Sequence, residues 1–196
     1  DAYYNRGNAK IDLKDYAGAI ADYTKALDIN PKYADAYFNR GLAKINLKDY
    51  VGVIADYTKA LDINPKYEEV YVNRGVAKAG LKDYAGAIAD YSKALEVNPK
   101  DADAYYNRGN AKIDLKDYSG AIADLNKALD INPKYSKAYY IRGNAKIDLK
   151  DYSGAIADYS KALEINPNLF KAYSNRGTTK IYLGDYSGAI ADYSKA

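Results

Sequence analysis

Asparagine recurs at one place in a 34-residue period, and its side chain can recognise a peptide. The positions are Asn5, Asn39, Asn73, Asn107 and Asn175. Each lies inside a segment of helical periodicity, where asparagine is less favourable than alanine by roughly several tenths of a kcal/mol. An amide donates and accepts hydrogen bonds at once, so a column of amides could hold the backbone of an extended peptide. The alternative is that each amide bonds a neighbouring helix.

Two charged positions also recur with this period and call for partners. Arg6 and its equivalents, and Lys10 and its equivalents, fall among apolar residues. Asp22 recurs with Arg6 in every period, which predicts an ion pair between facing helices. Such a pair would set the register of the two helices more than it would add stability. For Lys10 we expect only that its stem lies on the core and its amine reaches water.

Enzymatic chemistry has little support. The chain has neither cysteine nor histidine, so it lacks thiolate nucleophiles, the usual zinc ligands and the usual catalytic base. Asp, Lys and Tyr remain, but they recur as structural positions do, whereas an active site is normally singular. We therefore expect no catalytic residue, no metal site and no cofactor, and a protein that is not an enzyme.

The charge balance argues against nucleic acid as a partner. Lys and Arg total 29 against 26 Asp and Glu, and the two signs alternate along the chain. This net charge of +3 is small and evenly spread. No apolar run approaches the ~18 residues of a membrane helix. We expect no membrane insertion and a soluble protein, for which a cytoplasmic location is favoured.

Glycine and proline mark the elements that must position these side chains. Gly7 and Pro31 each return every 34 residues, without any insertion. The residue before proline leaves the helical region, so Asn-Pro predicts a turn between repeats. Within one period, apolar residues at helical spacing run from Asp1 to about Leu13 and from Tyr16 to about Ile29. Asp15 is placed to cap the second segment. The unit is helix, turn, helix.

These residues resemble the signature of the tetratricopeptide repeat over the whole chain. The matching positions in the first period are Tyr3, Gly7, Leu13, Tyr16, Ala19, Ile20, Tyr23, Ala26 and Pro31. The resemblance implies an all-α, right-handed α-solenoid of stacked antiparallel hairpins, with the first helices lining a concave groove. We expect a single array whose repeats span about 1–33, 34–67, 68–101, 102–135, 136–169 and a shorter 170–196.

The groove implied by this resemblance predicts a scaffold that binds another protein or a peptide. One polar stripe of the first helices would line it, with aromatic residues beside the stripe. The charge on this stripe changes from acidic, beginning at Asp1, to basic at Lys137 and Lys171. The candidate binding residues are Asn5, Asn8, Asn39, Asn73, Asn107, Asn110, Asn144, Asn175, Tyr4, Phe38, Tyr106, Tyr140, Lys137 and Lys171.

Two alternatives to peptide binding stay open. One is end-to-end self-association, which we expect if the face that carries Ala189 and Tyr193 has neither a further repeat nor a polar capping helix beside it. A spacer or targeting role in a larger protein is the other. Gly18 and its equivalents also have two readings. They form either a flat strip for lateral packing or a neutral substitution on an exposed face.

Overall fold

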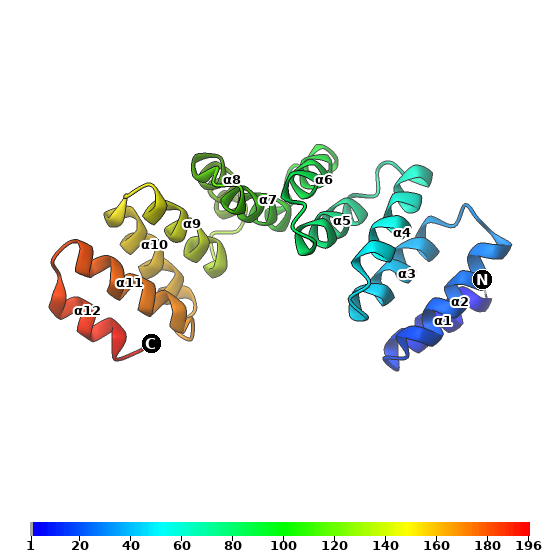
Figure 1. The fold of residues 1–196 in the computed structure, drawn as a ribbon, viewed down its shortest axis with the longest axis horizontal. Coiled ribbons are helices and arrows are strands. Elements are labelled where there is room, and N and C mark those ends of the chain that lie inside the picture. The colour runs from blue at the N-terminus through cyan, green and yellow to red at the C-terminus, as the bar shows by residue number, and fades with distance from the viewer. Residues whose placement is uncertain (1) are drawn as a thin grey trace. The chain divides into compact units, whose positions relative to one another are not determined.

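The computed structural model describes residues 2–196, which form twelve helices and no strand. The first six are α1 (Ala2–Asp12), α2 (Tyr16–Ile29), α3 (Ala34–Asn46), α4 (Tyr50–Ile63), α5 (Glu68–Gly80) and α6 (Tyr84–Val97). The others are α7 (Ala102–Asp114), α8 (Tyr118–Ile131), α9 (Ser136–Asp148), α10 (Tyr152–Ile165), α11 (Phe170–Tyr182) and α12 (Tyr186–Tyr193). Each predicted repeat contains one helical hairpin (Figure 1).

An aspartate starts the second helix of every hairpin, as its sequence position predicts. The Asp15 carboxylate accepts a hydrogen bond from the Gly18 N–H at 2.9 Å, and all six hairpins repeat this contact. A Cβ built on Gly18 would overlap the Asp15 carboxylate. Neither of the two sequence-based readings of this glycine considered that contact. The glycine makes room for the N-cap.

The turn inside each hairpin contains a residue in the left-handed region. It is a lysine in five hairpins, with Lys14 at φ 60° and Lys48 at φ 59° as examples, and Gly184 at φ 80° in the sixth. A side chain with a Cβ is strained there, whereas glycine is not. The tight turn is therefore closed at some conformational cost in all hairpins except the last.

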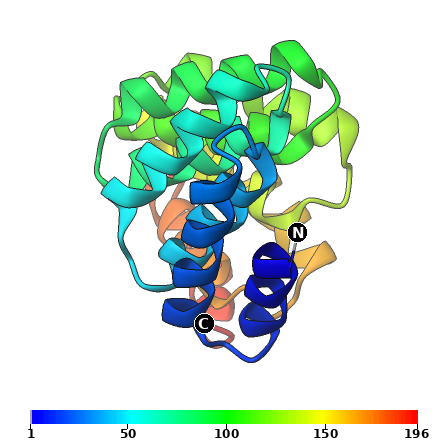
Figure 2. The ribbon, with the colours of Figure 1, turned by 90° about the vertical axis from the view of Figure 1, so that its right-hand side faces the viewer.

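The chain divides into two compact units, Asp1–Pro99 and Lys100–Ala196. Each unit has three hairpins, and within a unit the first helix of one hairpin packs against the second helix of the hairpin before it. Figure 2 shows the blue α1–α2 hairpin from the side. Whether the six repeats form a single array stays a prediction.

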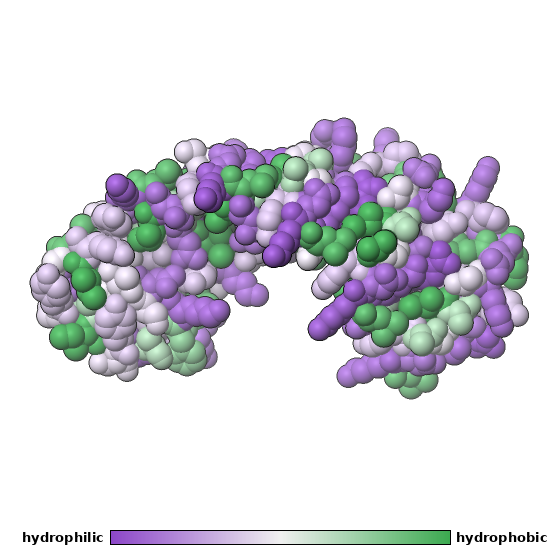
Figure 3. Space-filling view, viewed as in Figure 1, coloured by the Kyte–Doolittle hydropathy of each residue, from purple (hydrophilic) through white to green (hydrophobic). Residues whose placement is uncertain are grey.

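Small residues and tyrosines fill the space between paired helices, as the sequence predicts. Tyr23 is 1% exposed, and a Cβ added to Gly7 would lie 2.6 Å from its ring. Close packing therefore requires glycine opposite this tyrosine. On the face drawn in Figure 3, hydrophobic and hydrophilic residues interleave in both units.

Candidate functional site

The predicted ion pair between Arg6 and Asp22 is confirmed. Nε and Nη2 of Arg6 donate to the two carboxylate oxygens of Asp22 at 2.8 and 2.5 Å. Asp22 is 2% exposed, and the pair recurs in all six hairpins. The hydrogen bond from Arg6 and, to a smaller extent, that from Lys10 hold the pKa of Asp22 well below its usual range.

The expectation for Lys10 is wrong. Its Nζ lies 2.9 Å from Asp22 Oδ2 and also donates to the Gly18 carbonyl at 3.3 Å. Asp22 accepts from both cations, because one buried carboxylate has lone pairs for more than one donor. The triad is a structural element of each hairpin, in which two cations pair with one buried carboxylate.

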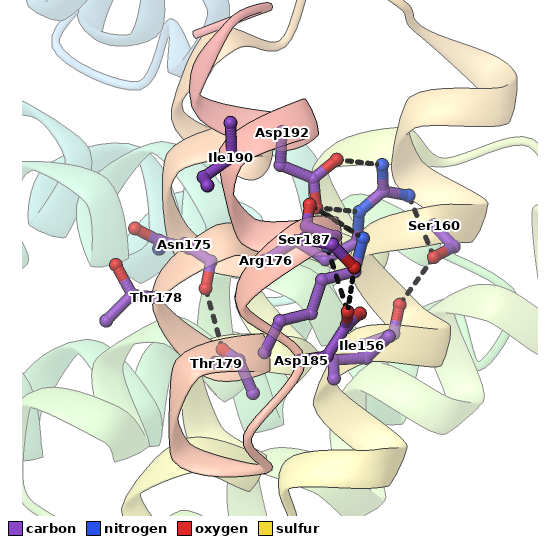
Figure 4. Close-up of polar contacts among 12 residues, drawn as sticks. Ile156, Ser160, Asn175, Arg176, Thr178, Thr179, Asp185, Ser187, Ile190 and Asp192 are labelled. Atoms are coloured by element: carbon purple, nitrogen blue, oxygen red, sulfur yellow. Dashed lines mark hydrogen bonds and ion pairs between the residues drawn. The ribbon is translucent and has the colours of Figure 1, made fainter.

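The arginines also join consecutive hairpins. Nη1 of Arg40 donates to Thr24 Oγ1 at 3.0 Å, and Nη1 of Arg176 donates to Ser160 Oγ at 2.9 Å. Figure 4 shows Arg176 between Asp192 of α12 and Ser160 of α10, while Asn175 and Thr178 project from the other side of α11. Each first helix therefore presents an anchoring side and a separate amide-bearing side.

On the amide-bearing side of the first junction, four polar side chains form a continuous chain of hydrogen bonds. Nδ2 of Asn39 donates to Tyr4 Oη at 2.9 Å and to Asn8 Oδ1 at 3.1 Å. The Tyr23 hydroxyl donates to the same Asn8 oxygen at 2.7 Å. Burial raises the pKa of Tyr23 to about 12, with smaller effects from Tyr4 and Asp12, so this hydroxyl remains a donor at neutral pH.

The same network recurs in the second unit, at residues four repeats later. Asn175 Nδ2 donates to Asn144 Oδ1 at 3.0 Å and to Tyr140 Oη at 3.3 Å. The Tyr159 hydroxyl donates to Asn144 Oδ1 at 2.8 Å. Two junctions in different units thus arrive at one hydrogen-bond pattern.

Other predicted asparagines behave differently. Nδ2 of Asn73 donates to the carbonyl of Glu69, one turn earlier in its own helix, at 2.9 Å. Asn5 and Asn110 are exposed, and Asn107 is half-buried. The alternative of bonding to a neighbouring helix therefore describes Asn39 and Asn175, and the uniform ladder does not describe the whole set.

The predicted aromatic residues mainly pack against other tyrosines, either within a hairpin or at the turn that leads to the next one. Tyr4 lies 4.7 Å from Tyr33 between ring centroids, and Tyr106 and Tyr140 make similar contacts with Tyr135 and Tyr159. Phe38 is 6% exposed between Tyr57 and Tyr67. This burial is at odds with the prediction that Phe38 contacts a partner, because a core side chain offers a ligand little surface.

A cavity opens beside each of the two networks. The first, of about 230 Å³, is lined by Asn8, Ile11, Asp12, Tyr23, Asn39 and Leu42. The second, of about 260 Å³, is lined by Asn144, Ile147, Asp148, Tyr159, Asn175, Thr178, Thr179 and Tyr182. We call these the first pit and the second pit. The candidate list omitted their acidic residues, Asp12 and Asp148, although both lie in the polar stripe one turn after Asn8 and Asn144.

The predicted basic residues lie apart from the pits. Lys137 and Lys171 are exposed in the first turns of α9 and α11. Asp103, at the equivalent place in α7, accepts a 2.6 Å hydrogen bond from the Tyr135 hydroxyl. Within the second unit the sequence therefore changes from acidic to basic along the first helices. Asp1, where the predicted gradient begins, lies outside the described residues.

Comparison with known protein families shows which family this chain belongs to. A profile described as tetratricopeptide repeat matches residues 34–67, 102–135 and 136–169, and one described as TPR repeat matches residues 7–48 and 80–113. The chain belongs to the tetratricopeptide repeat family. No curated protein matches the sequence significantly.

Solved tetratricopeptide structures share this fold. A tetratricopeptide repeat protein from Parabacteroides merdae has a TM-score of 0.86 and 22% identity, covering 99% of this chain and 77% of its own. MamA has a TM-score of 0.76 and 27% identity, covering 79% and 91%. YrrB, described as having an unusual peptide-binding site, has a TM-score of 0.74 and 22% identity, covering 88% and 89%.

The tetratricopeptide fold is a scaffold for protein–protein interactions, and it is typically non-catalytic. Within residues 2–196, no helix of this tetratricopeptide chain is both long and apolar enough to cross a bilayer. In the same part of the chain, no three acidic side chains gather as a metal site would require.

Proposed function

We infer that this chain binds an extended segment of a partner polypeptide on the amide-bearing sides of its first helices. The observation that carries this proposal is the pair of equivalent pits, each lined by both polar and apolar side chains. Concave sites with a few fixed polar groups are the usual form of a binding site. YrrB, whose fold is similar, is described as a peptide-binding protein.

The hydrogen-bond networks favour binding because they hold the amides in place before a ligand arrives. Asn8 and Asn39 are each restrained by partners from other helices, so little side-chain entropy is lost on binding. The Arg–Asp–Lys triads fix the same helices from their opposite side. A partner would meet a surface that needs little rearrangement.

A peptide library screened against the chain tests this function. The decisive variant carries Asn39→Ala and Asn175→Ala, which removes one amide from each pit. The matched control is Asn73→Ala, because Asn73 bonds only its own helix among the described residues. We expect the double variant to lose binding and the control to keep it, with circular dichroism unchanged in both.

A chain that captured no peptide would contradict the proposal. So would a double variant that bound every selected peptide as tightly as the unaltered chain.

Self-association is a second candidate function, and one observation favours it. Nη1 of Arg6 has no acceptor among the described residues, and the Arg6 side chain is 56% exposed, against 16% for Arg40. Ser194 has the position of Thr24 and Ser160 in its repeat, and its hydroxyl accepts from no described arginine. Ile190, beside Ser194, is 68% exposed. A second copy's Arg6 would complete the junction seen between hairpins.

Sedimentation velocity over a broad concentration range tests this association. We expect reversible growth in size that Ile190→Lys abolishes, because a charge would be placed in the new interface. Leu149→Lys is the control, since Leu149 is an exposed apolar residue at a hairpin turn. A concentration-independent monomer would exclude the association.

A further inference from the structure

We propose that each pit is a specific site for one carboxamide side chain, Gln or Asn, of the bound polypeptide. This inference rests on the peptide-binding function and names the chemistry that the pits select. It follows from the hydrogen-bonding groups that the two networks leave unused, from the charge beside them and from the size of the cavities.

In the first pit the network leaves one donor and one acceptor unused. Asn8 Oδ1 accepts from Tyr23 and from Asn39, so both of its lone pairs are taken. Asn39 Nδ2 uses its two hydrogens on Tyr4 and Asn8. Among the described residues, Asn8 Nδ2 therefore keeps its hydrogens and Asn39 Oδ1 keeps its lone pairs.

Side chains of the partner can be ranked by the hydrogen bonds that they form with Asn8 Nδ2 and Asn39 Oδ1. A carboxamide accepts from Asn8 Nδ2 through its oxygen and donates to Asn39 Oδ1 through its nitrogen. A carboxylate can satisfy only the donor, and it meets Asp12 with like charge. An ammonium or guanidinium group is attracted by Asp12, but it can satisfy only the acceptors and it leaves the Asn8 hydrogens facing a positive charge.

Asp12 lies close enough to bias this choice. It lines the first pit, and its charge contributes to the raised pKa of the Tyr23 hydroxyl. Asp148 has the same relation to Tyr159 in the second pit. Each carboxylate adds an acceptor for the second hydrogen of a bound carboxamide. Each repels an acidic side chain and attracts a basic one, so discrimination against Lys rests on the unpaired amide hydrogens of Asn8 and Asn144.

The size of the pits favours a single side chain over a larger ligand. Volumes of about 230 and 260 Å³ fall below the ~300–1,000 Å³ of drug-sized ligand sites. Tyr23 and Tyr159, which line the two pits, are each 1% exposed. A peptide backbone following the surface would pass over the opening, and a side chain would reach the amides.

The two pits share this recognition chemistry but differ at one wall. Leu42 in the first pit is replaced by Thr178 in the second, and Tyr182 adds an aromatic ring there. The Asn–Asn pair, the tyrosine and the aspartate are unchanged. We therefore expect the same preference for a carboxamide in both pits, with different tolerance for neighbouring residues.

Side-chain amide NMR of the full chain tests the proposal directly. The probes are short blocked peptides of alanine with one central residue, which is Gln, Glu, Lys or Ala. We expect the Gln peptide to shift the amide signals of Asn8, Asn39, Asn144 and Asn175 and to leave Asn73 unchanged. Binding of the Glu peptide should be about tenfold weaker, as expected when a hydrogen-bonded contact is lost. The Lys peptide should also bind more weakly than the Gln peptide but by a smaller factor, because Asp12 and Asp148 attract its charge. The Ala peptide reports binding through the backbone alone.

Two variants separate recognition from folding. Asn39→Ala should remove the response at the first pit and leave that at the second. Tyr4→Phe keeps the ring but removes the acceptor of Asn39 Nδ2, so the amide can turn over. We expect the preference for Gln over Glu to fall in Tyr4→Phe while the fold is retained, a change that lost packing would not produce.

Two other results would overturn the inference in distinguishable ways. Equal responses to the Gln, Glu, Lys and Ala peptides would refute carboxamide selection while leaving peptide binding intact. Library peptides that bind with no response at the four asparagines would place the binding site elsewhere. Failure of all library peptides to bind would instead remove the underlying function.

Discussion

Two junctions between hairpins of the first unit have equivalent sequence positions but different hydrogen bonding. Between the first and second hairpins, Asn39 is held by Tyr4 and Asn8. Between the second and third, Phe38 and Leu42 occupy the positions of Tyr4 and Asn8, and Asn73 turns to its own helix. The Tyr57 hydroxyl is buried there without a hydrogen-bond partner. Two substitutions in one helix thus convert a polar pit into an apolar core.

This contrast shows that an asparagine at a recurring position is not a binding residue by itself. Its orientation depends on what the preceding first helix offers. The Arg–Asp–Lys triad, by comparison, is the same at both junctions, because all three members belong to one hairpin.

The largest expected effect comes from breaking the part that both junctions share. Asp56→Ala leaves Arg40 and Lys44 without their buried carboxylate, and we expect a loss of about 3 kcal/mol in the free energy of unfolding. Asp22→Ala should cost less, because Arg6 is far more exposed than Arg40. Urea denaturation of both variants measures the difference. Equal losses would show that exposure of the arginine does not matter.

Removing the hydroxyl of Tyr23 should lower the free energy of unfolding, whereas removing that of Tyr57 should raise it. Tyr23→Phe removes a donor to Asn8, and we expect a loss of about 1 kcal/mol. Tyr57→Phe removes a buried, unpaired hydroxyl, and we expect a gain of about 1 kcal/mol. Thermal and urea unfolding of the pair test the contrast. A loss in both variants would mean that Tyr57 has a partner after all.

Leu42→Asn should give the second junction the polar character of the first. The new amide oxygen lies where it could accept from the Tyr57 hydroxyl and from Asn73 Nδ2. We expect Asn73 to release Glu69 and to join the response to the Gln peptide in NMR. Stability should change little, because the new hydrogen bonds offset the lost apolar contact. An unchanged Asn73 signal would show that Phe38 prevents the switch.

A small effect on stability is expected at the turns inside the hairpins. Lys48→Gly removes the backbone strain of a lysine in the left-handed region. We expect a gain of roughly 0.5–1 kcal/mol in the free energy of unfolding. Gly184→Lys is the reverse control and should lose a similar amount. Differential scanning calorimetry can follow both. A loss of stability in Lys48→Gly would show that the lysine side chain makes up for the strain.

The sequence alone determined the hairpins, their caps and the ion pairs. Periodicity and the Asn-Pro turns predict helices whose hydrogen bonds are local, and Arg6 lies only 16 residues from Asp22 within one hairpin. Contacts of this kind repeat with the period, so self-comparison of the sequence reveals them. The role of Gly18 was missed because it depends on how closely the Asp15 side chain folds over the helix start.

Only the tertiary structure decided which amides form a site. Asn39 is held by Asn8 and Tyr4, 31 and 35 residues earlier, across a junction between hairpins. The orientation of each amide depends on the residues of the preceding repeat and on the depth of the tyrosine behind them. The recurrence of asparagine in the sequence does not give this orientation, because equivalent asparagines form hydrogen bonds with different neighbouring groups in the packed structure.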